Sequence, residues 1–427
     1  MEQIQELFPG IRLRCLAGSR FKQSCLTVQA VTRADAETTP VKTLIPAILL
    51  RGSAKYPDLR AIARKLDSLY GTSAGALVRK VGDYQTVGLY FSFIDDRYAM
   101  PGDRLLAAVV SFLEELMLNP LLENGVFKKE IVESEKKNLL AAIDSARNDK
   151  RSYASFRLLQ EVCRGDAFGI SRLGNREDAE KITAEGTWEL YQKILREAPV
   201  EIIYVGGEQP RQVAELLRPV FARLQRDCRP VPEQTVFVPG KPGSWEETME
   251  VAQARLCMAF STPITQRDED FAAMQVANAV FGTSMTSKLF MNVREKMSLC
   301  YDIGSSYFST KGLLEVSAGI APGDREAAET EILRQLEECQ KGHITEEELE
   351  AAREAFLSGL RTVTDSAGAM EHYYSGGILG GRIRSIAQYK KEIRAVTAED
   401  AARAARTLTP CGVYFLKGGD SCGKTGV

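Results

Sequence analysis

The sequence contains very few histidines. Among its 427 residues there are two, His343 and His372, and the first half of the chain has none. Histidine is the commonest side chain that binds metals in proteins, and a catalytic zinc ion usually has three protein ligands. A histidine-based zinc site is therefore excluded from the first half of the chain.

Long hydrophobic runs are missing as well. No stretch of about 18 apolar residues is present, and residues 1–20 lack the apolar core of a signal peptide. The nine cysteines are an odd number and form no C-x-x-C pair, which favours reduced thiols over a disulfide framework or a structural zinc site. We therefore expect a cytoplasmic protein without a membrane span.

The charge balance is nearly even. The chain has 55 basic and 57 acidic residues, a net charge of −2, and 44% hydrophobic residues. This composition is that of an ordinary globular protein, and the net charge provides no long-range attraction to nucleic acid or to an anionic membrane. We expect neither as a partner. At about 100 to 200 residues per domain, the length indicates two to four domains.

A proline-rich segment interrupts the middle of the chain. Residues 226–245 read RDCRPVPEQTVFVPGKPGSW and contain four prolines. Proline prevents regular helix and favours an extended tether. The sequence therefore predicts an N-terminal domain at 1–225, a linker at 226–247 and a C-terminal domain at 248–427.

The two halves show a similar order of predicted elements. In the first half, the patterns predict strands at 24–30, 74–81, 85–93 and 200–205, and helices at 41–50, 58–70, 103–118, 123–146 and from 210 onward. In the second half, they predict strands at 248–260, 299–309, 313–320 and 413–416, and helices at 268–281, 288–296 and across 324–408. We therefore expect an α+β fold of two tandem homologous α/β-sandwich domains, each a mainly antiparallel sheet covered by helices.

Two short motifs carry a family resemblance. Residues 49–53 read Leu-Leu-Arg-Gly-Ser, and residues 293–301 read VREKMSLCY. They resemble the Leu-Phe-Lys-Gly-Thr and Leu-Arg-Glu-Lys-x-Gly-Leu-x-Tyr motifs of the pitrilysin/insulinase metallopeptidases, the inverzincins, and the resemblance extends over nearly the whole chain. It implies the half-clam arrangement of that family and places the chain near a non-catalytic bacterial branch.

The resemblance also identifies the positions of the missing zinc site. In active members, an H-x-x-E-H helix supplies two zinc-binding histidines and a glutamate as general base. The matching positions here are Thr43, Pro46 and Ala47, and the third ligand, a later glutamate, corresponds to Ala142. None of these side chains replaces a zinc ligand or the base. We therefore expect no metal, no cofactor and no autonomous peptidase activity in this chain.

Arg294 and Tyr301 match residues that assist catalysis in the family. The resemblance implies that they project toward the zinc of another half, hold the substrate backbone and stabilise the developing oxyanion. The alternative is that Arg294 pairs with a nearby carboxylate and Tyr301 packs at the start of a strand. Ser298 stands between them, where the family usually has glycine.

Residues 375–381 are rich in glycine. The segment follows no strand and lacks the Lys-Ser/Thr of a phosphate-binding loop. We expect a mobile loop between helices, and a weaker hypothesis by analogy gives it peptide contacts through Gly376, Gly377, Gly380 and Gly381. Just before it, residues 368–372 read GAMEH, for which a solvent-facing or capping His372 is a better interpretation than a metal site.

The sequence therefore predicts a non-catalytic, substrate-holding subunit. Its expected partner is an H-x-x-E-H homologue that brings the zinc and forms a heterodimer with this chain around a peptide substrate. Two alternatives stay open. One is a scaffolding role, as for the core subunits of respiratory complexes, and the other is a homodimer that binds peptides without cleaving them.

Overall fold

The computed structural model describes residues 2–17, 20–251 and 253–418. The chain forms two compact units whose segments alternate along the sequence. Unit 1 contains the chain up to Asp144, Ile170–Glu233 and Thr362–Gly376, and unit 2 contains Ser145–Gly169, Gln234–Arg361 and the chain from Gly377 onward. One helical segment from each half is thus built into the unit of the other half. Composition and periodicity do not predict this exchange.

Unit 1 is built on a seven-stranded sheet in the order β1-β2-β9-β3-β6-β4, with β5 also paired to β6. Its strands are β1 (Glu2–Phe8), β2 (Ile11–Ala17), β3 (Gln23–Arg33), β4 (Ser73–Leu77), β5 (Lys80–Val81), β6 (Tyr84–Ile94) and β9 (Val200–Gly206). All pairs are antiparallel except β2 with β9. The β1–β2 hairpin is missing from the sequence-based prediction.

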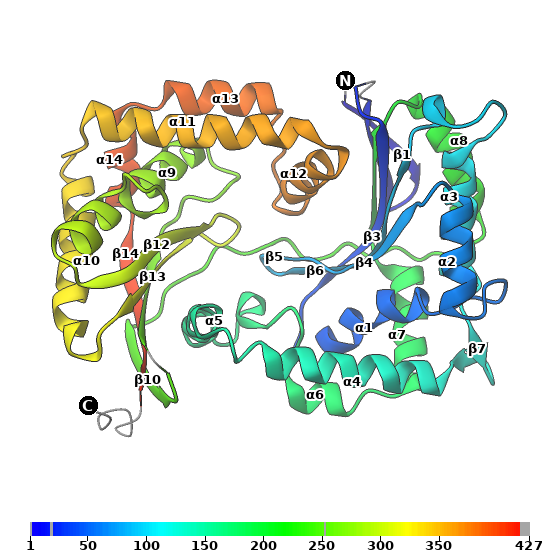
Figure 1. The fold of residues 1–427 in the computed structure, drawn as a ribbon, viewed down its shortest axis with the longest axis horizontal. Coiled ribbons are helices and arrows are strands. Elements are labelled where there is room, and N and C mark those ends of the chain that lie inside the picture. Colours follow the sequence, from blue (N-terminus) through cyan, green and yellow to red (C-terminus); the bar gives the residue numbers. More distant parts are fainter. Residues whose placement is uncertain (1, 18–19, 252, 419–427) are drawn as a thin grey trace, which may run out of the picture. The chain divides into compact units, whose positions relative to one another are not determined.

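Helices cover both faces of this sheet. They are α1 (Thr39–Leu49), α2 (Leu59–Ser68), α3 (Leu105–Leu118), α4 (Lys129–Ser145), α6 (Arg176–Glu180), α7 (Ala184–Glu197), α8 (Pro210–Ala222) and α12 (Ala367–Leu379). Side chains alternate along β3: Leu26 and Val28 join the main hydrophobic core, whereas Thr27 and Gln29 bond to residues of α12. Figure 1 shows α12 on the side of the sheet opposite α2, α3 and α8.

The predicted helix at 123–146 begins later than expected. Leu122–Glu123 and Val126–Phe127 form a small antiparallel hairpin, β7 and β8, and α4 starts only at Lys129. The turn is Asn124-Gly125, and both residues have positive φ, 53° and 82°. Asn-Gly is the preferred sequence of a two-residue hairpin turn, so local turn chemistry overrides helical periodicity here.

Unit 2 is built on a five-stranded sheet in the order β10-β14-β11-β13-β12. Its strands are β10 (Gly243–Met249), β11 (Ala254–Ser261), β12 (Cys300–Phe308), β13 (Leu313–Ile320) and β14 (Thr409–Gly418). Only β10 pairs in parallel, with β14. The predicted strand at 248–260 is therefore wrong in one respect, because it is two strands, and the first already begins inside the predicted linker.

The helices of unit 2 are α5 (Lys150–Val162), α9 (Phe271–Asn278), α10 (Arg325–Gln340), α11 (Glu346–Thr362), α13 (Ile386–Ala395) and α14 (Ala398–Arg406). Along β11, Cys257 and Ala259 pack against α5, whereas Phe260 packs edge-on against Phe281 on the other face.

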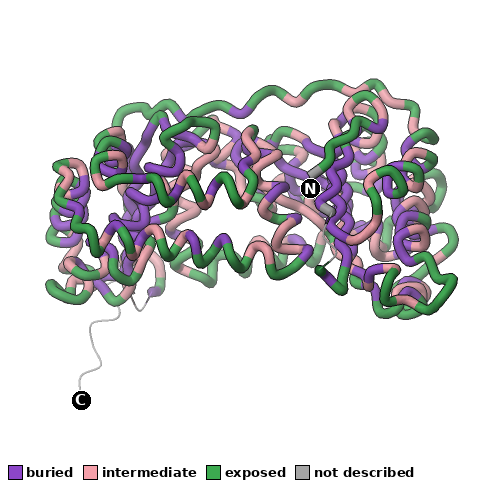
Figure 2. Tube along the Cα trace, turned by 90° about the horizontal axis from the view of Figure 1, so that it is seen from above, coloured by how far each residue is buried: buried purple, intermediate pink, exposed green. Residues whose placement is uncertain are grey.

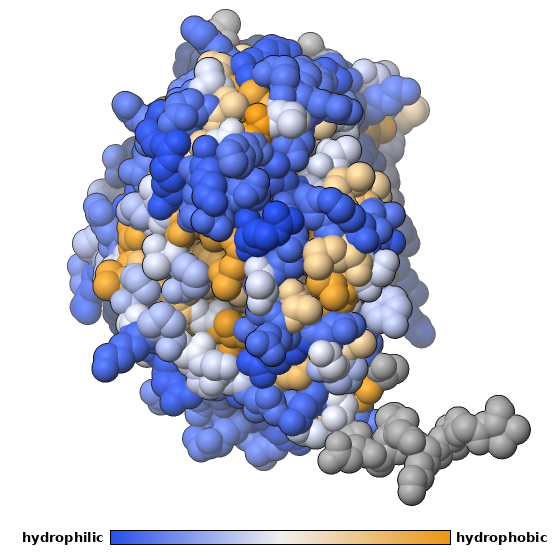
Figure 3. Space-filling model, turned by 90° about the vertical axis from the view of Figure 1, so that its left-hand side faces the viewer, coloured by the Kyte–Doolittle hydropathy of each residue, from blue (hydrophilic) through white to orange (hydrophobic). Residues whose placement is uncertain are grey.

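In both units, the buried residues concentrate along the strands and on the inner faces of the helices (Figure 2). The face of unit 2 in Figure 3 is mainly hydrophilic, with small scattered apolar patches. No helix in the described part of the chain is both long enough and apolar enough to span a membrane.

Candidate functional site

The helix that matches the family's zinc-binding helix is α1, and its polar groups are bonded within unit 1. The hydroxyl of Thr43 lies 3.0 Å from the carbonyl oxygen of Thr39 and 2.7 Å from that of Arg172, to which it donates. It accepts a hydrogen bond from Nε2 of the buried Gln85 at 3.1 Å. At the position where active members carry the first zinc-binding histidine, the Thr43 side chain is therefore engaged in hydrogen bonds within unit 1. Gln85 was not singled out by sequence reasoning, because its pattern is that of an ordinary strand residue.

The other positions of the degenerate motif carry no donor for a metal. Pro46 is buried inside α1, Ala47 offers only a methyl group, and Ala142 is exposed on α4. Within the described residues, no group of three or more His, Cys, Asp or Glu side chains is placed to hold a metal ion. The zinc ion that the resemblance implies therefore does not fit the residues present.

The end of α1 is nonetheless held against α4. The guanidinium of Arg51 lies 2.5 Å from the Glu135 carboxylate, and its Nη2 donates to the Ser134 hydroxyl at 2.9 Å. These bonds keep together the two helices that, by the resemblance, supply zinc ligands in active members.

The segment that contains Arg294 and Tyr301 joins a π-helix, Leu289–Lys296, to β12. Ser298 N donates to Arg294 O and Leu299 N donates to Val293 O, both at 3.0 Å. Ser298 has φ +55°, a left-handed conformation that costs a non-glycine residue about 1–2 kcal/mol. A left-handed turn at this position is consistent with the glycine that the family resemblance leads us to expect there.

Both side chains singled out in this segment reach solvent. Tyr301 is 70% exposed, so it does not pack at the strand start. The Arg294 side chain is 39% exposed; its guanidinium lies 4.6 Å from the centre of the Phe290 ring, and its Nε is 3.7 Å from a Glu295 oxygen. That contact is long for an ion pair between partly exposed groups, and such a pair contributes little to stability.

The charge of Arg294 also acts on the start of β12. Burial raises the pKa of the Cys300 thiol to about 11, and the Arg294 charge opposes this rise.

Exposed methionines accompany this pair. Met285 is 79% exposed, Met291 48% and Met297 46%. Methionine is flexible and polarizable, and it is over-used at surfaces that bind varied partners. All three lie within nine residues of Arg294 in the sequence, and we call Met285, Met291, Met297 and Tyr301, together with Arg294, the methionine surface. Sequence reasoning missed the three methionines because exposure cannot be inferred from an isolated apolar residue.

The glycine-rich segment is helical, so the predicted mobile loop is wrong. Helix α12 continues to Leu379 and includes Gly376 and Gly377. A Cβ at Gly380 would lie 1.5 Å from Nε2 of Gln266, and Gly381 has φ +86°. Glycine has low helix propensity, but tertiary packing overrides propensity. Close packing therefore accounts for Gly380, and a left-handed turn accounts for Gly381.

Glu371, within the GAMEH segment, is a buried anchor for α12. Its two oxygens accept from Nη1 and Nη2 of Arg79 at 2.8 and 2.6 Å, and from the Thr27 hydroxyl at 2.9 Å. His372 is exposed, and Nδ1 of His343 lies 2.8 Å from the Glu338 carboxylate. The solvent-facing interpretation of His372 is thus confirmed, whereas no sequence signal identified Arg79 as the partner of Glu371.

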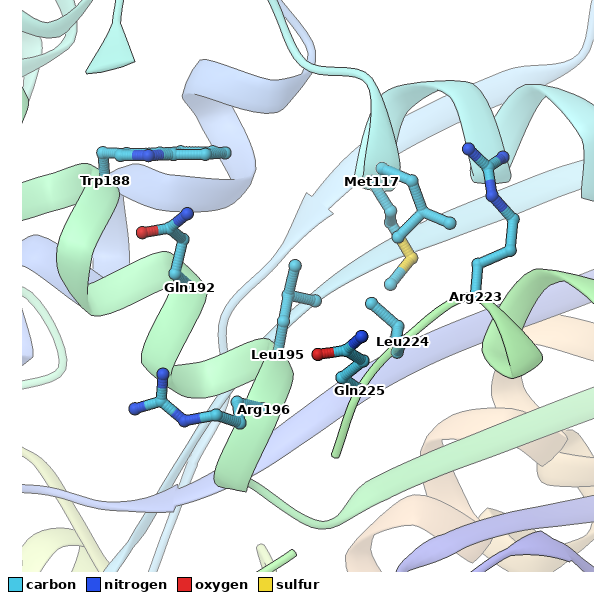
Figure 4. Close-up of a pocket in the computed structure, with 9 residues that line it drawn as sticks. Met117, Trp188, Gln192, Leu195, Arg196, Arg223, Leu224 and Gln225 are labelled. Carbon is cyan, nitrogen blue, oxygen red and sulfur yellow. The ribbon is translucent and has the colours of Figure 1, made fainter. Parts of the chain in front are cut away.

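Unit 1 also has hollows on its surface. One of about 390 Å³ lies between α7 and the C-terminal ends of α3 and α8. Figure 4 shows Met117, Leu195 and Leu224 converging at its centre, with Arg196 and Arg223 at its edges. Both arginines are already paired, with Glu197 at 2.8 Å and Glu114 at 2.6 Å. Their pairing leaves this hollow no free charge with which to select a ligand.

Comparison with known proteins identifies the family. A family profile described as Peptidase M16 inactive domain matches residues 181–356. A Bacillus subtilis protein described as a probable inactive metalloprotease, YmfF, is 29% identical over 419 residues, which cover 98% of both chains. The chain is an M16-family metallopeptidase homologue. M16 is the pitrilysin/insulinase family, so the family predicted from the two motifs is confirmed.

Two further proteins extend this comparison. YmxG of Bacillus subtilis, described as an uncharacterized zinc protease, is 28% identical over 162 residues, 37% of this chain and 39% of that protein. The crystal structure of a conserved protein from Enterococcus faecalis V583 matches with a TM-score of 0.91 and 28% identity, over 98% of this chain and 99% of that one. The predicted α+β fold, with sheets covered by helices, is confirmed.

Proposed function

We propose that this M16 homologue is the non-catalytic, substrate-holding subunit of a two-chain peptidase. Its partner is a homologous chain that carries H-x-x-E-H and the zinc ion, and the substrate is a peptide. Arg294 and Tyr301 donate hydrogen bonds to the substrate backbone and to the oxyanion that develops at the partner's zinc. The observation that carries the proposal is the exposure of both side chains in a chain whose own zinc-motif positions, 43, 46 and 47, carry no metal ligand.

Three features support this proposal. A guanidinium and a phenol O–H are both donors suited to a developing negative charge. The exposed methionines of the same chain segment offer adaptable apolar contacts for peptide side chains. Ser298 keeps a strained left-handed turn at the same segment, and strain of this kind is often retained at functional sites.

The relatives also support a pair of unlike chains. Bacillus subtilis has both a relative described as a probable inactive metalloprotease and one described as an uncharacterized zinc protease. A bacterium with both kinds of chain holds the two components that the proposal requires. Under the proposal, the chain has no autonomous activity, because it has no zinc ligands and no general base at residues 43, 46 and 47.

The test is co-expression with an H-x-x-E-H homologue encoded by the same organism, followed by a peptide-cleavage assay. We expect the pair to cleave and each chain alone to be inactive. Arg294→Ala and Tyr301→Phe are each expected to lower kcat by about 10²-fold, the usual cost of removing one oxyanion donor, with the pair still assembled on size exclusion. Zinc analysis should find the metal with the partner and not with this chain.

Arg334→Ala is the matched control. Arg334 is also a half-exposed arginine of unit 2, and its ion pair within the described part of the chain is with Glu331, one turn away, so cleavage should be unchanged. If the partner cleaves equally well alone, or Arg294→Ala has no effect on the pair, the shared site is refuted. A complex that assembles but never cleaves would favour the scaffolding role instead, and a stable homodimer that binds peptide would favour non-catalytic peptide binding.

A further inference from the structure

A second pocket of unit 1 combines apolar walls with unbalanced positive charge. It has a volume of about 370 Å³ and lies between the end of β3, the start of α1, helix α7 and residues 229–232. Small-molecule sites typically have about 300–1,000 Å³ and mostly apolar linings with a few polar groups. This pocket has that size and character, and it lies apart from the methionine surface in the sequence.

The proline-rich segment forms one preformed wall of this pocket. Pro230, Val231 and Pro232 line it, the Arg229 N–H donates to Glu197 O at 2.8 Å, and the Tyr84 hydroxyl donates to Pro232 O at 3.0 Å. Proline has no N–H that would need a partner in an apolar wall. These two bonds hold residues 229–232 of the predicted linker in place, and this short stretch shapes the pocket.

The opposite wall is apolar and buried. Val31 at the end of β3, Ile194 on α7 and Ala198 just after α7 are each less than 9% exposed. These side chains and the proline segment provide contact area for an aliphatic or aromatic group of a ligand. Burial of such a group supplies affinity of about 25 cal/mol per Å².

The charged groups of the pocket are mainly cations. Arg33, Lys42, Lys193 and Arg229 line it against only Asp35 and Glu197. The two acids already have partners: Asp35 accepts from Lys42 Nζ and from Thr38 N at 2.8 and 2.7 Å, and Glu197 pairs with Arg196 at 2.8 Å. Arg229 is paired as well, with Asp227 at 3.5 Å and Glu197 at 3.9 Å. The positive charge that no ion pair of the described residues compensates is therefore that of Arg33 and Lys193.

The charges of Lys42 and Lys193 act on each other across this pocket. The Lys42 side chain is buried, and its ammonium donates to Arg33 O and to Asp35, both at 2.8 Å, which leaves one of its three donors. Burial lowers the pKa of Lys42, the bond to Asp35 opposes this, and the charge of Lys193 lowers the pKa further. Lys193 is exposed and forms no ion pair within the described part of the chain. An anion near both ammonium groups would relieve their repulsion.

We propose that this pocket binds a carboxylate attached to an apolar group. The carboxylate lies between Lys42 and Lys193, and the apolar group packs against Ile194, Ala198 and the proline segment. Two sources offer this chemistry, a free apolar acid and the C-terminal residue of a peptide. The hollow in Figure 4 has a similar volume but paired arginines, and it is not expected to select an anion.

The test is calorimetric titration of the purified chain with octanoate and, separately, with a short peptide that ends in leucine. Octanamide and the amidated peptide have the same apolar groups without the charge. We expect one saturable site with a Kd below about 1 mM for octanoate, for the free-acid peptide, or for both, and binding at least about tenfold weaker for the neutral analogues. Binding of octanoate alone identifies a free acid as the ligand, and binding of the peptide alone identifies a C-terminus.

Two variants and one control complete the experiment. Lys193→Gln removes an exposed charge without disturbing the core and should weaken binding about tenfold. Val231→Trp fills the pocket with the charges intact and should abolish binding. Lys129→Gln, a second exposed lysine of unit 1, should change nothing. The proposal is overturned if neither acid binds, if the amides bind equally well, or if Lys193→Gln leaves the Kd unchanged. None of these results depends on a peptidase partner, so they are independent of the proposed shared site.

Discussion

Helices α12 and α5 perform the same structural task in the two units but are held by different chemistry. Each lies on the face of a sheet that the other helices of its unit leave uncovered, and each comes from the opposite half of the sequence. Helix α12 is anchored by the buried Arg79–Glu371 ion pair and by a bond from Gln29 to Ser375. Helix α5 is anchored mainly by Ala154 and Leu158, both fully buried against β11 and β13, and its Tyr153 hydroxyl and Arg157 guanidinium also contact Glu247 at 3.0 and 3.5 Å.

The difference shows that one architectural role does not require one kind of interaction. A buried ion pair gains little over a well-packed apolar contact, because two charges must lose their hydration, but it is costly to break. We infer that the polar anchor of α12 mainly determines which helix docks and in which register, whereas the apolar anchor of α5 mainly supplies stability. The face under α5 also contains a buried carboxyl group, Glu315, whose Oε1 has no hydrogen-bond partner among the described residues.

The two tryptophans make this comparison measurable one unit at a time. Trp188 lies in α7 of unit 1 and Trp245 in β10 of unit 2, and the chain has only these two. In a Trp245→Phe background the fluorescence reports on unit 1, and in a Trp188→Phe background it reports on unit 2. Urea unfolding of each background then gives a separate midpoint for each anchor.

The largest effect is expected from Arg79→Met. Glu371 is 1% exposed, and removal of its bidentate partner leaves a buried, uncompensated carboxylate. The expected loss is about 3–5 kcal/mol of unit 1 stability, read from the urea midpoint of Trp188 fluorescence. The double variant Arg79→Met/Glu371→Met should recover most of this loss, since it removes both charges. Arg211→Met, at an exposed arginine, is the control. A double variant as unstable as the single one would contradict the view that the pair mainly provides specificity.

A smaller loss is expected from Leu158→Ala on the apolar anchor. Leu158 is fully buried among Cys257, Ala259 and Leu313, so truncation leaves a cavity and costs about 2–4 kcal/mol, measured on Trp245. Leu333→Ala, at a partly exposed leucine of the same unit, should cost less than about 1 kcal/mol. If Leu158→Ala proves neutral, packing does not anchor α5, and the comparison between the two helices fails.

Much of this fold was accessible from the sequence because it depends on local patterns. The alternation in β3 and β6, the helical periodicity of α2 and α3, and the motif at 293–301 are all readable along the chain. The exchange of α5 and α12 was not, because the choice between two similar sheet faces is made by contacts between residues some 290 positions apart, such as Arg79 with Glu371. The pocket walled by Pro230 and Pro232 was missed for the same reason, since a proline-rich segment does not reveal where it packs.

The positions of the degenerate zinc site were recognisable, but their surroundings were not. The family resemblance, counted back from Gly52, assigns them to Thr43, Pro46 and Ala47. That Gln85 and the Arg172 carbonyl enclose the Thr43 hydroxyl depends on tertiary packing. Likewise, the sequence identified Arg294 and Tyr301 as a pair, but only the structure shows that Tyr301 is exposed and that Ser298 holds a left-handed turn between them.

The smallest effect, and the only gain, is expected from Glu315→Gln. Burial raises the pKa of the Glu315 carboxyl above its usual value, although Ser155 and Cys257 oppose the shift. The folded state therefore holds this proton more tightly than the unfolded state, so stability falls as the pH rises from the unfolded pKa through the folded one. Glutamine cannot ionise, and the variant should be about 1 kcal/mol more stable at pH 7 than the wild type, with the difference shrinking toward pH 4.

The matched control for this last change is Glu326→Gln, at an exposed glutamate of α10. It should shift the Trp245 midpoint little at either pH, because water already hydrates that carboxylate. A Glu315→Gln variant that is less stable at pH 7 would mean that the charged carboxylate is used, with Ser155 as one of its donors, to hold α5. The face under α5 would then be anchored by a buried charge as α12 is, and the contrast between a polar and an apolar anchor would disappear.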